Sequence, residues 1–255
     1  MIKNILITGG AQRIGKEIAM YFAKKGWNVI IHFNKSRKEA IALEKKILSM
    51  GVRCITIQAD LSNSDEIKSI FKTIKKKIGI IDCLVNCASI FENDDILSFN
   101  NKKWKSHFDV NLKAPAILCG EFAKQSRNTK GNIINITDQR VFKLTPYFLS
   151  YTLSKAGLET LTKILAMKFA PNIRVNAIAP GPVIKNKRQS KKHFEKQFKN
   201  TILKKQVKII NICKTLEFIL NNDSITGVTI PVDSGQSLAW KTPCLLYTSP
   251  SPRDS

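Results

Sequence analysis

The chain has 255 residues, of which 43% are hydrophobic, and its 42 Lys and Arg residues against 19 Asp and Glu residues give a formal net charge of +23. The hydrophobic content excludes an intrinsically disordered chain, and the length suits a single α/β domain. The sequence holds neither an apolar run near the roughly 18 to 20 residues that cross a bilayer nor a secretory signal after Met1. We therefore expect a cytoplasmic protein without a membrane segment.

Short runs of β-branched residues alternate with longer amphipathic segments, a pattern typical of parallel strands joined by helices. The predicted strands are Lys3–Thr8, Asn28–Phe33, Arg53–Gln58, Cys83–Asn86, Asn132–Thr137, Arg174–Ala179 and Val228–Val232. The predicted helices are Gly15–Lys25, Arg37–Met50, Ser64–Ile78, Trp104–Gln125, Tyr151–Phe169 and Lys208–Leu220. The sequence thus predicts an α/β fold, a doubly wound parallel sheet of about seven strands with helices on both faces.

Two segments lie outside this alternation. Lys185–Lys205 is irregular and basic, and it stands where an open α/β fold can place a cover over the strand ends. It predicts either a substrate lid or a solvated basic helix. The stretch from Cys244 to Asp254 changes to a short apolar run and a Ser/Pro tail, which resembles a translated sequencing adapter. We therefore assign 1–241 to the domain and interpret 242–255 as a non-native tail.

The cysteines and histidines indicate no metal site. The six cysteines form no C-x-x-C pair, so we expect reduced core residues, and the three histidines match no zinc pattern. The excess positive charge is spread along the chain beside many Ile and Asn residues, which, like Lys, have codons rich in A and T. Base composition accounts for the charge at least as well as nucleic-acid binding does, and we expect no nucleic-acid partner.

A glycine-rich turn, Thr8–Gly15 (TGGAQRIG), follows the first predicted strand and leads directly into a predicted helix. Glycines at this point permit a tight turn and a close approach of the backbone to a pyrophosphate, which then lies at the positive end of the helix. An ordinary glycine-rich turn is the alternative. The turn predicts a dinucleotide site, with these residues at the cofactor: Gly9, Arg13, Ile14 and Gly15.

The end of the second predicted strand lacks the acidic residue that holds the ribose 2′-hydroxyl in sites selective for NAD. Cationic and hydroxyl side chains stand there instead, and they suit a 2′-phosphate because they supply charge-assisted hydrogen bonds to a dianion. This favours NADPH as the cofactor, with a solvated basic loop as the alternative. The expected contacts are His32, Asn34, Lys35 and Ser36.

Two further strand ends carry candidate cofactor contacts. Asp60 and Leu61 follow the third strand, where a carboxylate suits the adenine amino group. Asn86 and Ala88 lie at the end of the fourth strand, where the chain passes under the cofactor. A simple strand-to-turn transition is the alternative for the second pair.

Tyr151 and Lys155 are four residues apart at the start of a predicted helix, so both side chains lie on one helical face. A neighbouring ammonium and the positive nicotinamide of an oxidised cofactor lower the pKa of a phenol, which makes it a usable proton donor or acceptor. The pair predicts acid–base chemistry only in combination with the cofactor turn, because this spacing is common by chance.

Several motifs occur in a fixed order. They are the glycine turn, Asp60–Leu61, Asn86–Ser89, Asn111, Tyr151 with Lys155, Arg174–Asn176, Pro180–Gly181 and Gly227 with Val232–Gly235. Together they resemble the short-chain dehydrogenase/reductase family over residues 1–241. The resemblance implies a Rossmann domain, usually in a homotetramer, that binds its cofactor also through Pro180 and Gly181. It further implies that Tyr151 is the proton donor, Lys155 binds the nicotinamide ribose and Asn111 helps a proton relay.

The departures from the family pattern narrow the substrate class. Asp138 stands where the family usually has a Ser that holds a substrate carbonyl, and Arg13 replaces the middle glycine of the turn. Ser234 stands where Gly is usual, which predicts a slightly strained or rearranged turn after the last strand. Together with the loop from His32 to Ser36, the residues Arg13, Asp138, Ser89 and Phe91 resemble the pteridine reductase and dihydromonapterin reductase branch of the family.

A pterin is a flat, polar heterocycle, and the same residues suit it chemically. Phe91 can stack on one face while the nicotinamide covers the other, and Ser89 can bond a ring edge. Arg13 can bridge cofactor phosphate and substrate, and Asp138 with Tyr151 can relay a proton. The expected reaction is hydride transfer from NADPH to a carbon of a pterin C=N bond, with protonation of the adjacent nitrogen, giving a tetrahydropterin.

Alternatives remain open. A carbonyl reductase of the same family, acting on a 3-oxoacyl thioester or another ketone, is the main one, although an ionised Asp138 would repel a developing alkoxide. A noncatalytic nucleic-acid-binding protein is remote, because Tyr151, Lys155 and Asn111 are intact. At the level of single residues, Asp138 could be a surface carboxylate in a noncatalytic turn and Phe91 a plain core residue.

Overall fold

The strands of the chain join one parallel sheet. The computed structural model describes residues 2–125, 130–185 and 189–239. Its strands are β1 (Asn4–Ile7), β2 (Asn28–Phe33), β3 (Cys54–Gln58), β4 (Cys83–Asn86), β5 (Gly131–Ile136), β6 (Ile173–Pro180) and β7 (Thr229–Val232). Their spatial order is β3-β2-β1-β4-β5-β6-β7, and every pair is parallel. The predicted α/β fold is confirmed.

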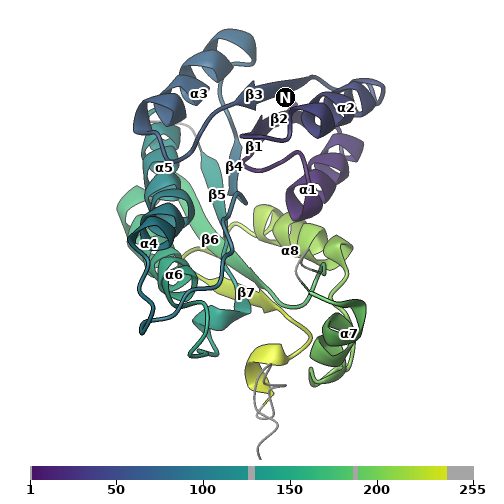
Figure 1. The fold of residues 1–255 in the computed structure, drawn as a ribbon. Coiled ribbons are helices and arrows are strands. Elements are labelled where there is room, and N and C mark those ends of the chain that lie inside the picture. Colours follow the sequence, from purple (N-terminus) through teal and green to yellow (C-terminus); the bar gives the residue numbers. More distant parts are fainter. Residues whose placement is uncertain (1, 126–129, 186–188, 240–255) are drawn as a thin grey trace, which may run out of the picture.

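Helices cover both faces of the sheet. They are α1 (Arg13–Lys24), α2 (Arg37–Leu48), α3 (Ser64–Lys77), α4 (Asn101–Phe108), α5 (Ala114–Lys124), α6 (Leu149–Phe169), α7 (Lys191–Lys199) and α8 (Ile209–Asn221). Figure 1 shows α3 to α6 on one side of the sheet and α1, α2 and α8 on the other. No helix in the described part of the chain is long and apolar enough to cross a membrane.

The prediction of one regular helix over Trp104–Gln125 is corrected. The helical stretch begins earlier, at Asn101, and is interrupted by a π-helical turn, η1 (Asp109–Lys113), between α4 and α5. Periodicity cannot reveal one wider turn, because it shifts the helical face by only a fraction of a residue. Asn111 lies in this turn and is fully buried, so the irregular turn is where the chain presents its amide to the site.

The segment predicted as either a lid or a basic helix contains α7. Phe194 points its ring into the protein and is 8% exposed, whereas Lys191, Lys192, Lys196 and Lys199 are exposed. The helical alternative therefore describes this part of the segment. The chain after it returns to the turn that follows β7, where the Leu203 N–H donates to the Ser234 carbonyl at 3.1 Å.

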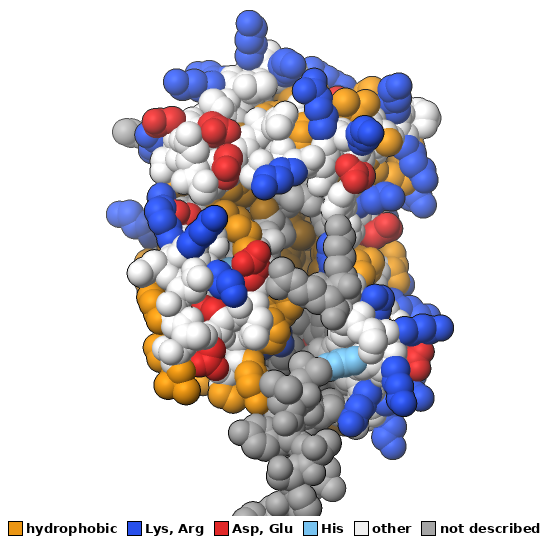
Figure 2. Space-filling model, in the orientation of Figure 1, with side chains coloured by type: hydrophobic (Ala, Val, Ile, Leu, Met, Phe, Trp, Pro, Cys, Tyr) orange, Lys and Arg blue, Asp and Glu red, His pale blue; other side chains and the backbone are white. Residues whose placement is uncertain are grey.

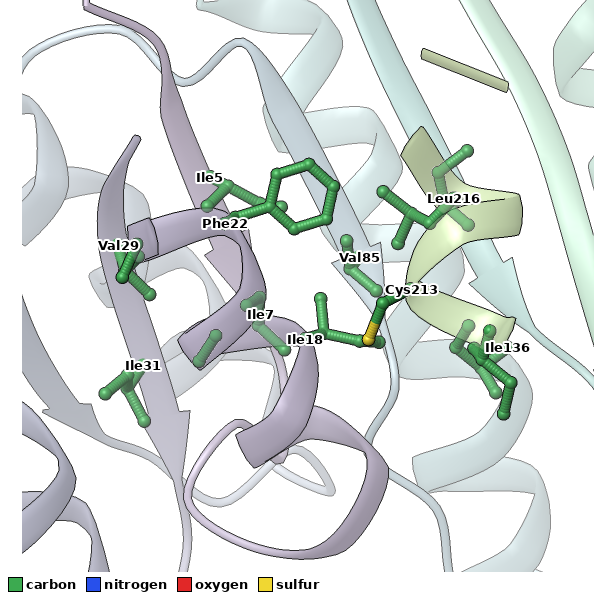
Figure 3. Close-up of a cluster of buried hydrophobic side chains, with 14 of the residues drawn as sticks. Ile5, Ile7, Ile18, Phe22, Val29, Ile31, Val85, Ile136, Cys213 and Leu216 are labelled. Atoms are coloured by element: carbon green, nitrogen blue, oxygen red, sulfur yellow. The ribbon is translucent and has the colours of Figure 1, made fainter. Parts of the chain in front are cut away.

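The core follows from the alternation of side chains along buried strands. Ile5 and Ile7 pack with Phe22 of α1 and Leu216 of α8 on one face, as Figure 3 shows. Leu6, between them, points to the other face. Residues buried on both faces make the strands continuous hydrophobic runs, as is usual for parallel sheets. Five cysteines within the described residues are free, and four of these are buried.

Ser234 adopts φ +56°, and Gly235 follows with φ +76°. The left-handed region favours glycine at both positions, so the backbone of Ser234 is strained, as the sequence predicts for this turn. The predicted non-native tail, 242–255, lies outside the described residues.

His32, at the end of β2, ties three neighbouring strand ends together. Its Nδ1 accepts the N–H of Gly9 at 3.2 Å, and its Nε2 donates to the Ala59 carbonyl at 3.0 Å. The ring is 1% exposed, and burial lowers the pKa of His32 from 6.5 to about 4. The imidazole is therefore neutral near pH 7, with its proton on Nε2.

We expect the free energy of unfolding to carry a pH-dependent contribution from His32. Its folded pKa of about 4 lies below the ordinary 6.5, so the unfolded chain binds this proton more readily. The contribution of neutral His32 to the free energy of unfolding is fully present above pH 6.5. The free energy of unfolding falls by up to about 3 kcal/mol as the pH drops towards 4. His32→Gln should remove this dependence. Urea unfolding of both proteins between pH 4 and 7 measures the difference, and a constant difference would contradict the assignment.

Candidate active site

The turn between β1 and α1 is packed too tightly for side chains at its glycines. A Cβ on Gly15 would lie 2.4 Å from the Gly9 carbonyl oxygen, and one on Gly9 would lie 3.0 Å from the Ala88 Cα. Gln12 does not cap α1 but donates from its side chain to Glu39 at 2.9 Å. The first N–H groups of α1 therefore have no side-chain cap at Gln12, as an anion site at a helix N-terminus requires.

Arg13 begins α1 with φ +52°, the left-handed region in which a glycine would be unstrained. Its side chain is exposed, and one guanidinium N–H donates to the Ile184 carbonyl at 3.4 Å. Arg13 thus links the β1–α1 turn to the segment after β6. The structure places it at the turn, as predicted, without a hydrogen bond or ring contact to Phe91 or Asp138.

The residues expected to contact the 2′-phosphate are buried at the end of β2 and largely exposed in the basic loop that follows it. Asn34 and Lys35 are exposed and Ser36 is half-buried, directly before the N-terminus of α2. His32 differs from its expected role, because both ring nitrogens bond the backbone and no part of the ring faces solvent. Alternation along β2 explains this, since a residue just inside the strand end still points into a packed face.

The third strand ends in a polar loop. Ser62 bonds the Asp60 carboxylate through its N–H at 2.9 Å and its hydroxyl at 2.8 Å. These bonds, with the positive charge of Lys35, lower the pKa of Asp60. Leu61 is buried beside it.

The fourth strand is tied to β1 and to β5. The Thr8 hydroxyl accepts the N–H of Ala88 at 3.0 Å, which fixes the chain after β4 beside the glycine turn. The Asn86 side chain is buried and donates to Asn135 at 2.8 Å. Beyond β6, Pro180 is buried and Gly181 passes so close to Asp233 that a Cβ would lie 2.5 Å from its Cα.

Tyr151 and Asp138 meet at the carboxyl end of the sheet. Asp138 follows β5, and its Oδ2 accepts the phenol O–H of Tyr151 at 2.8 Å. Lys155, one turn further along α6, is 2% exposed and donates to the Ile136 carbonyl at 2.8 Å. The predicted carboxylate is therefore hydrogen-bonded to Tyr151, and Lys155 lies beside them with its Nζ 5.9 Å from the centre of the Tyr151 ring.

The electrostatic environment reverses one expectation. Burial, followed by the charge of Asp138, raises the pKa of Tyr151 well above its usual value, although Arg140 opposes this. Lys155 and an oxidised cofactor are the influences on the phenol pKa that can be expected from the sequence, whereas burial arises only in the folded chain. Burial also lowers the pKa of Lys155 to about 8.

Arg140 and Phe148 are site residues that sequence reasoning missed. The Asp138 Oδ1 accepts the backbone N–H of Arg140 at 2.9 Å and one guanidinium N–H at 3.4 Å. The guanidinium carbon lies 5.4 Å from the ring centre of Phe91 and 5.1 Å from that of Phe148. A cation two residues after Asp138 was the available signal, but only the fold shows which rings it covers.

Phe91 lies against the catalytic candidates. Its ring is stacked on Phe148 at 4.5 Å with an interplanar angle of 12°, and it contacts the Tyr151 ring edge-on at 4.6 Å. Ser89 is exposed, and its hydroxyl donates to the Asn111 side chain at 3.1 Å. The structure therefore brings Ser89, Phe91 and Tyr151 to one wall of the site.

A family model described as short chain dehydrogenase matches residues 3–197. The protein thus belongs to the short-chain dehydrogenase family, whose members are oxidoreductases. The 3-oxoacyl-(acyl-carrier-protein) reductase FabG of Staphylococcus epidermidis is 31% identical over 241 residues, covering 92% of this chain and 99% of that protein.

Two solved structures are more similar in sequence. The structure of FolM alternative dihydrofolate reductase 1 from Brucella canis, complexed with NADP, is 41% identical with a TM-score of 0.91. The match covers 96% of this chain and 97% of that one. The corresponding protein of Brucella suis, also with NADP, is 41% identical with the same TM-score and covers 94% of this chain and 97% of its own.

We expect Asp138→Asn to move the alkaline limb of the pH–rate profile to lower pH. A phenol that acts as a proton donor must be protonated, so activity that depends on Tyr151 should be lost as pH rises through the pKa of this phenol. Removing the Asp138 charge removes one cause of the raised pKa, and activity should then be lost at a lower pH. Steady-state rates of both proteins from pH 6 to 11 measure the shift.

Tyr151→Phe is the matched control, since it should lower kcat by about 10² to 10⁴ at every pH. An alkaline limb that stays at the same pH in Asp138→Asn would show that Asp138 does not act on the phenol.

Proposed function

We propose that the protein is an NADPH-dependent reductase that converts a dihydropterin, such as dihydromonapterin, dihydrobiopterin or the pterin ring of dihydrofolate, to the tetrahydro form. The observation that carries this proposal is the hydrogen bond from Tyr151 to Asp138, 2.8 Å long, beneath the aromatic wall made by Phe91 and Phe148. The 41% identity to a protein described as an alternative dihydrofolate reductase supports it.

The residues suit the reduction of a C=N bond. Bound NADPH supplies a hydride to the carbon of that bond. Tyr151 donates its proton to the adjacent nitrogen, which takes the electron pair of the broken π bond, while the Asp138 carboxylate accepts the phenol O–H and holds it in place. A proton from solvent then restores the phenol. Lys155 is buried one helical turn beyond Tyr151, where its ammonium group can donate a hydrogen bond to the nicotinamide ribose. The products are the tetrahydropterin and oxidised cofactor.

The residues around the β1–α1 turn and after β2 fit a dinucleotide with a 2′-phosphate. The close packing at Gly9 and Gly15 leaves backbone N–H groups at the α1 terminus for the pyrophosphate. Lys35 and Ser36, at the α2 terminus, offer a cation and a hydroxyl to the 2′-phosphate. The NADP in the Brucella canis structure supports the same cofactor for this chain.

We expect Lys35→Glu to raise the KM for NADPH by about 10- to 100-fold and to leave the KM for NADH nearly unchanged, because a charge-assisted bond to the 2′-phosphate is lost. Lys45→Glu, an exposed site at the far end of α2, is the control with the same change in net charge. Equal losses with both cofactors would mean that Lys35 does not contact the 2′-phosphate.

A ketoreductase acting on 3-oxoacyl thioesters is the second candidate. The 31% identity to the Staphylococcus epidermidis reductase favours it. Against it stands the carboxylate of Asp138 at the phenol, since an anion there opposes the negative charge that develops on a reduced ketone.

One assay separates the two candidates. NADPH oxidation is followed with dihydromonapterin, dihydrobiopterin, dihydrofolate and a 3-oxoacyl thioester offered separately, and we expect turnover of the dihydropterins. Asp138→Ser should lower kcat with the dihydropterin by about 10-fold or more. Turnover of the thioester alone would overturn the proposal. A gain of thioester reduction with unchanged dihydropterin turnover would show that Asp138 does not select the pterin.

The assembly is proposed from the family resemblance and from one surface. A groove between α4–η1 and α6 is lined by apolar side chains that include Phe108, Leu112, Leu161 and Ile164. Ile164, which lines this groove, is 50% exposed, and Met167 of the same helix is 75% exposed. We propose that copies of the chain pack on this surface in a homotetramer.

In Figure 2 the Lys and Arg side chains of the described residues are spread over the top and both sides of the visible face rather than gathered in one patch.

A further inference from the structure

The loop after β4 is anchored to the helices at every second residue. Asn111 bonds both backbone groups of Ile90, with its Oδ1 accepting the N–H at 2.8 Å and its Nδ2 donating to the carbonyl at 3.0 Å. The Glu92 N–H donates to Nε2 of His107 at 3.1 Å. The Asp94 carboxylate accepts the N–H of Ser150 at 3.1 Å. Three successive anchors, on η1, α4 and α6, therefore hold the loop.

The second and third anchors are joined to each other. The Ser150 hydroxyl lies 2.5 Å from Asp94 Oδ2 and 2.6 Å from His107 Nδ1. Because Nε2 of His107 accepts the Glu92 N–H, its Nδ1 carries the proton and donates to Ser150, which in turn donates to Asp94. Burial lowers the pKa of His107, consistent with this neutral tautomer. We name His107, Ser150 and Asp94 the loop latch.

The loop latch is more deeply buried than a surface network. His107 and Ser150 are 0% exposed and Asp94 is 9% exposed. Removing polar groups from water is costly unless each has a partner, and here the chain of donors and acceptors is complete from the Glu92 N–H to the Asp94 carboxylate. Such a network is directional: it holds one relative position of loop and helix, which apolar packing would not.

The residues between the anchors form the wall of the site. The Ser89 hydroxyl bonds the Asn111 side chain, which also anchors Ile90, and Phe91 lies between the anchors at Ile90 and Glu92. Phe91 contacts the Tyr151 ring at 4.6 Å, and Tyr151 directly follows Ser150 of the loop latch. The same three side chains therefore set the distance between the aromatic wall and the phenol.

We propose that His107, Ser150 and Asp94 are positioning residues, which hold the loop carrying Ser89 and Phe91 against the start of α6 and so determine how tightly the flat ring of the substrate is bound. The identity of that ring as a pterin rests on the proposed function, whereas the positioning of the loop does not. The His107 ring lies edge-on to the Tyr151 ring with centroids 6.0 Å apart, and the hydrogen bonds of the loop latch go to neither the expected cofactor contacts nor the phenol oxygen.

Two variants open the loop latch at different points. His107→Phe keeps a ring of similar size and removes both hydrogen bonds, and Ser150→Ala removes the central hydroxyl. His107→Gln is the conservative variant, since its amide can still accept from the Glu92 N–H and donate to Ser150. Thr152→Val is the matched control, because its buried hydroxyl, on the same turn of α6, has no hydrogen-bond partner among the described residues.

Two measurements are made on each full-length variant. Amide hydrogen exchange reports the opening of the loop in a peptide that covers 88–97. We expect exchange there to be about tenfold faster in His107→Phe and Ser150→Ala, and close to wild type in His107→Gln and Thr152→Val. We also expect KM for the dihydropterin to rise about tenfold in the first two variants, with KM for NADPH within about twofold of wild type.

The outcomes separate the loop latch from the proposed function. Unchanged exchange at 88–97 in both opened variants would overturn the inference. Faster exchange throughout the protein, with KM raised equally for substrate and cofactor, would also overturn it, because it would show a general loss of stability. If the wild-type protein turns over no dihydropterin, the proposed function fails, and local exchange at 88–97 still decides whether the loop latch exists.

Discussion

The parallel register of the sheet is the constraint on which the site depends. The strand order reverses direction at β1, whose neighbours are β2 on one side and β4 on the other. Connections that leave β1 and β4 in opposite directions open a crevice at their carboxyl ends, where ligands bind in folds of this type. The glycine turn, the loop after β4 and Asp138 after β5 all arise at this edge because each directly follows a strand.

Buried polar groups then determine the details at that edge. His32, on β2, hydrogen-bonds the backbone after β1 and the backbone after β3. Tyr151 and Lys155 lie in buried surroundings that shift their pKa values. The loop latch satisfies His107 and its partners in the same way. Each of these groups is stable in the core only because it is hydrogen-bonded, so catalytic geometry and stability have one physical origin here.

The two kinds of similar protein are named for different substrates, and this difference has a chemical explanation. The fold and the Tyr151–Lys155 pair are common to reductases of ketones and of C=N bonds, so a relative at 31% identity and a solved structure at 41% identity can carry different substrate names. The carboxylate of Asp138 and the rings of Phe91 and Phe148 are the features on which that difference would depend. Asp138 and Phe91 contact Tyr151 directly, and Phe148 is stacked on Phe91.

The sequence by itself determined the strand order in the chain, the position of the glycine turn and the unusual residue Asp138, because periodicity, turn glycines and spacing are local properties. It could not place His32, Arg140 or Phe148, nor the direction of the Tyr151 pKa. Those depend on burial and on contacts between segments far apart in the chain, such as Asp94 with Ser150. Only tertiary structure decides them, since desolvation and hydrogen-bond geometry exist only once the chain is packed.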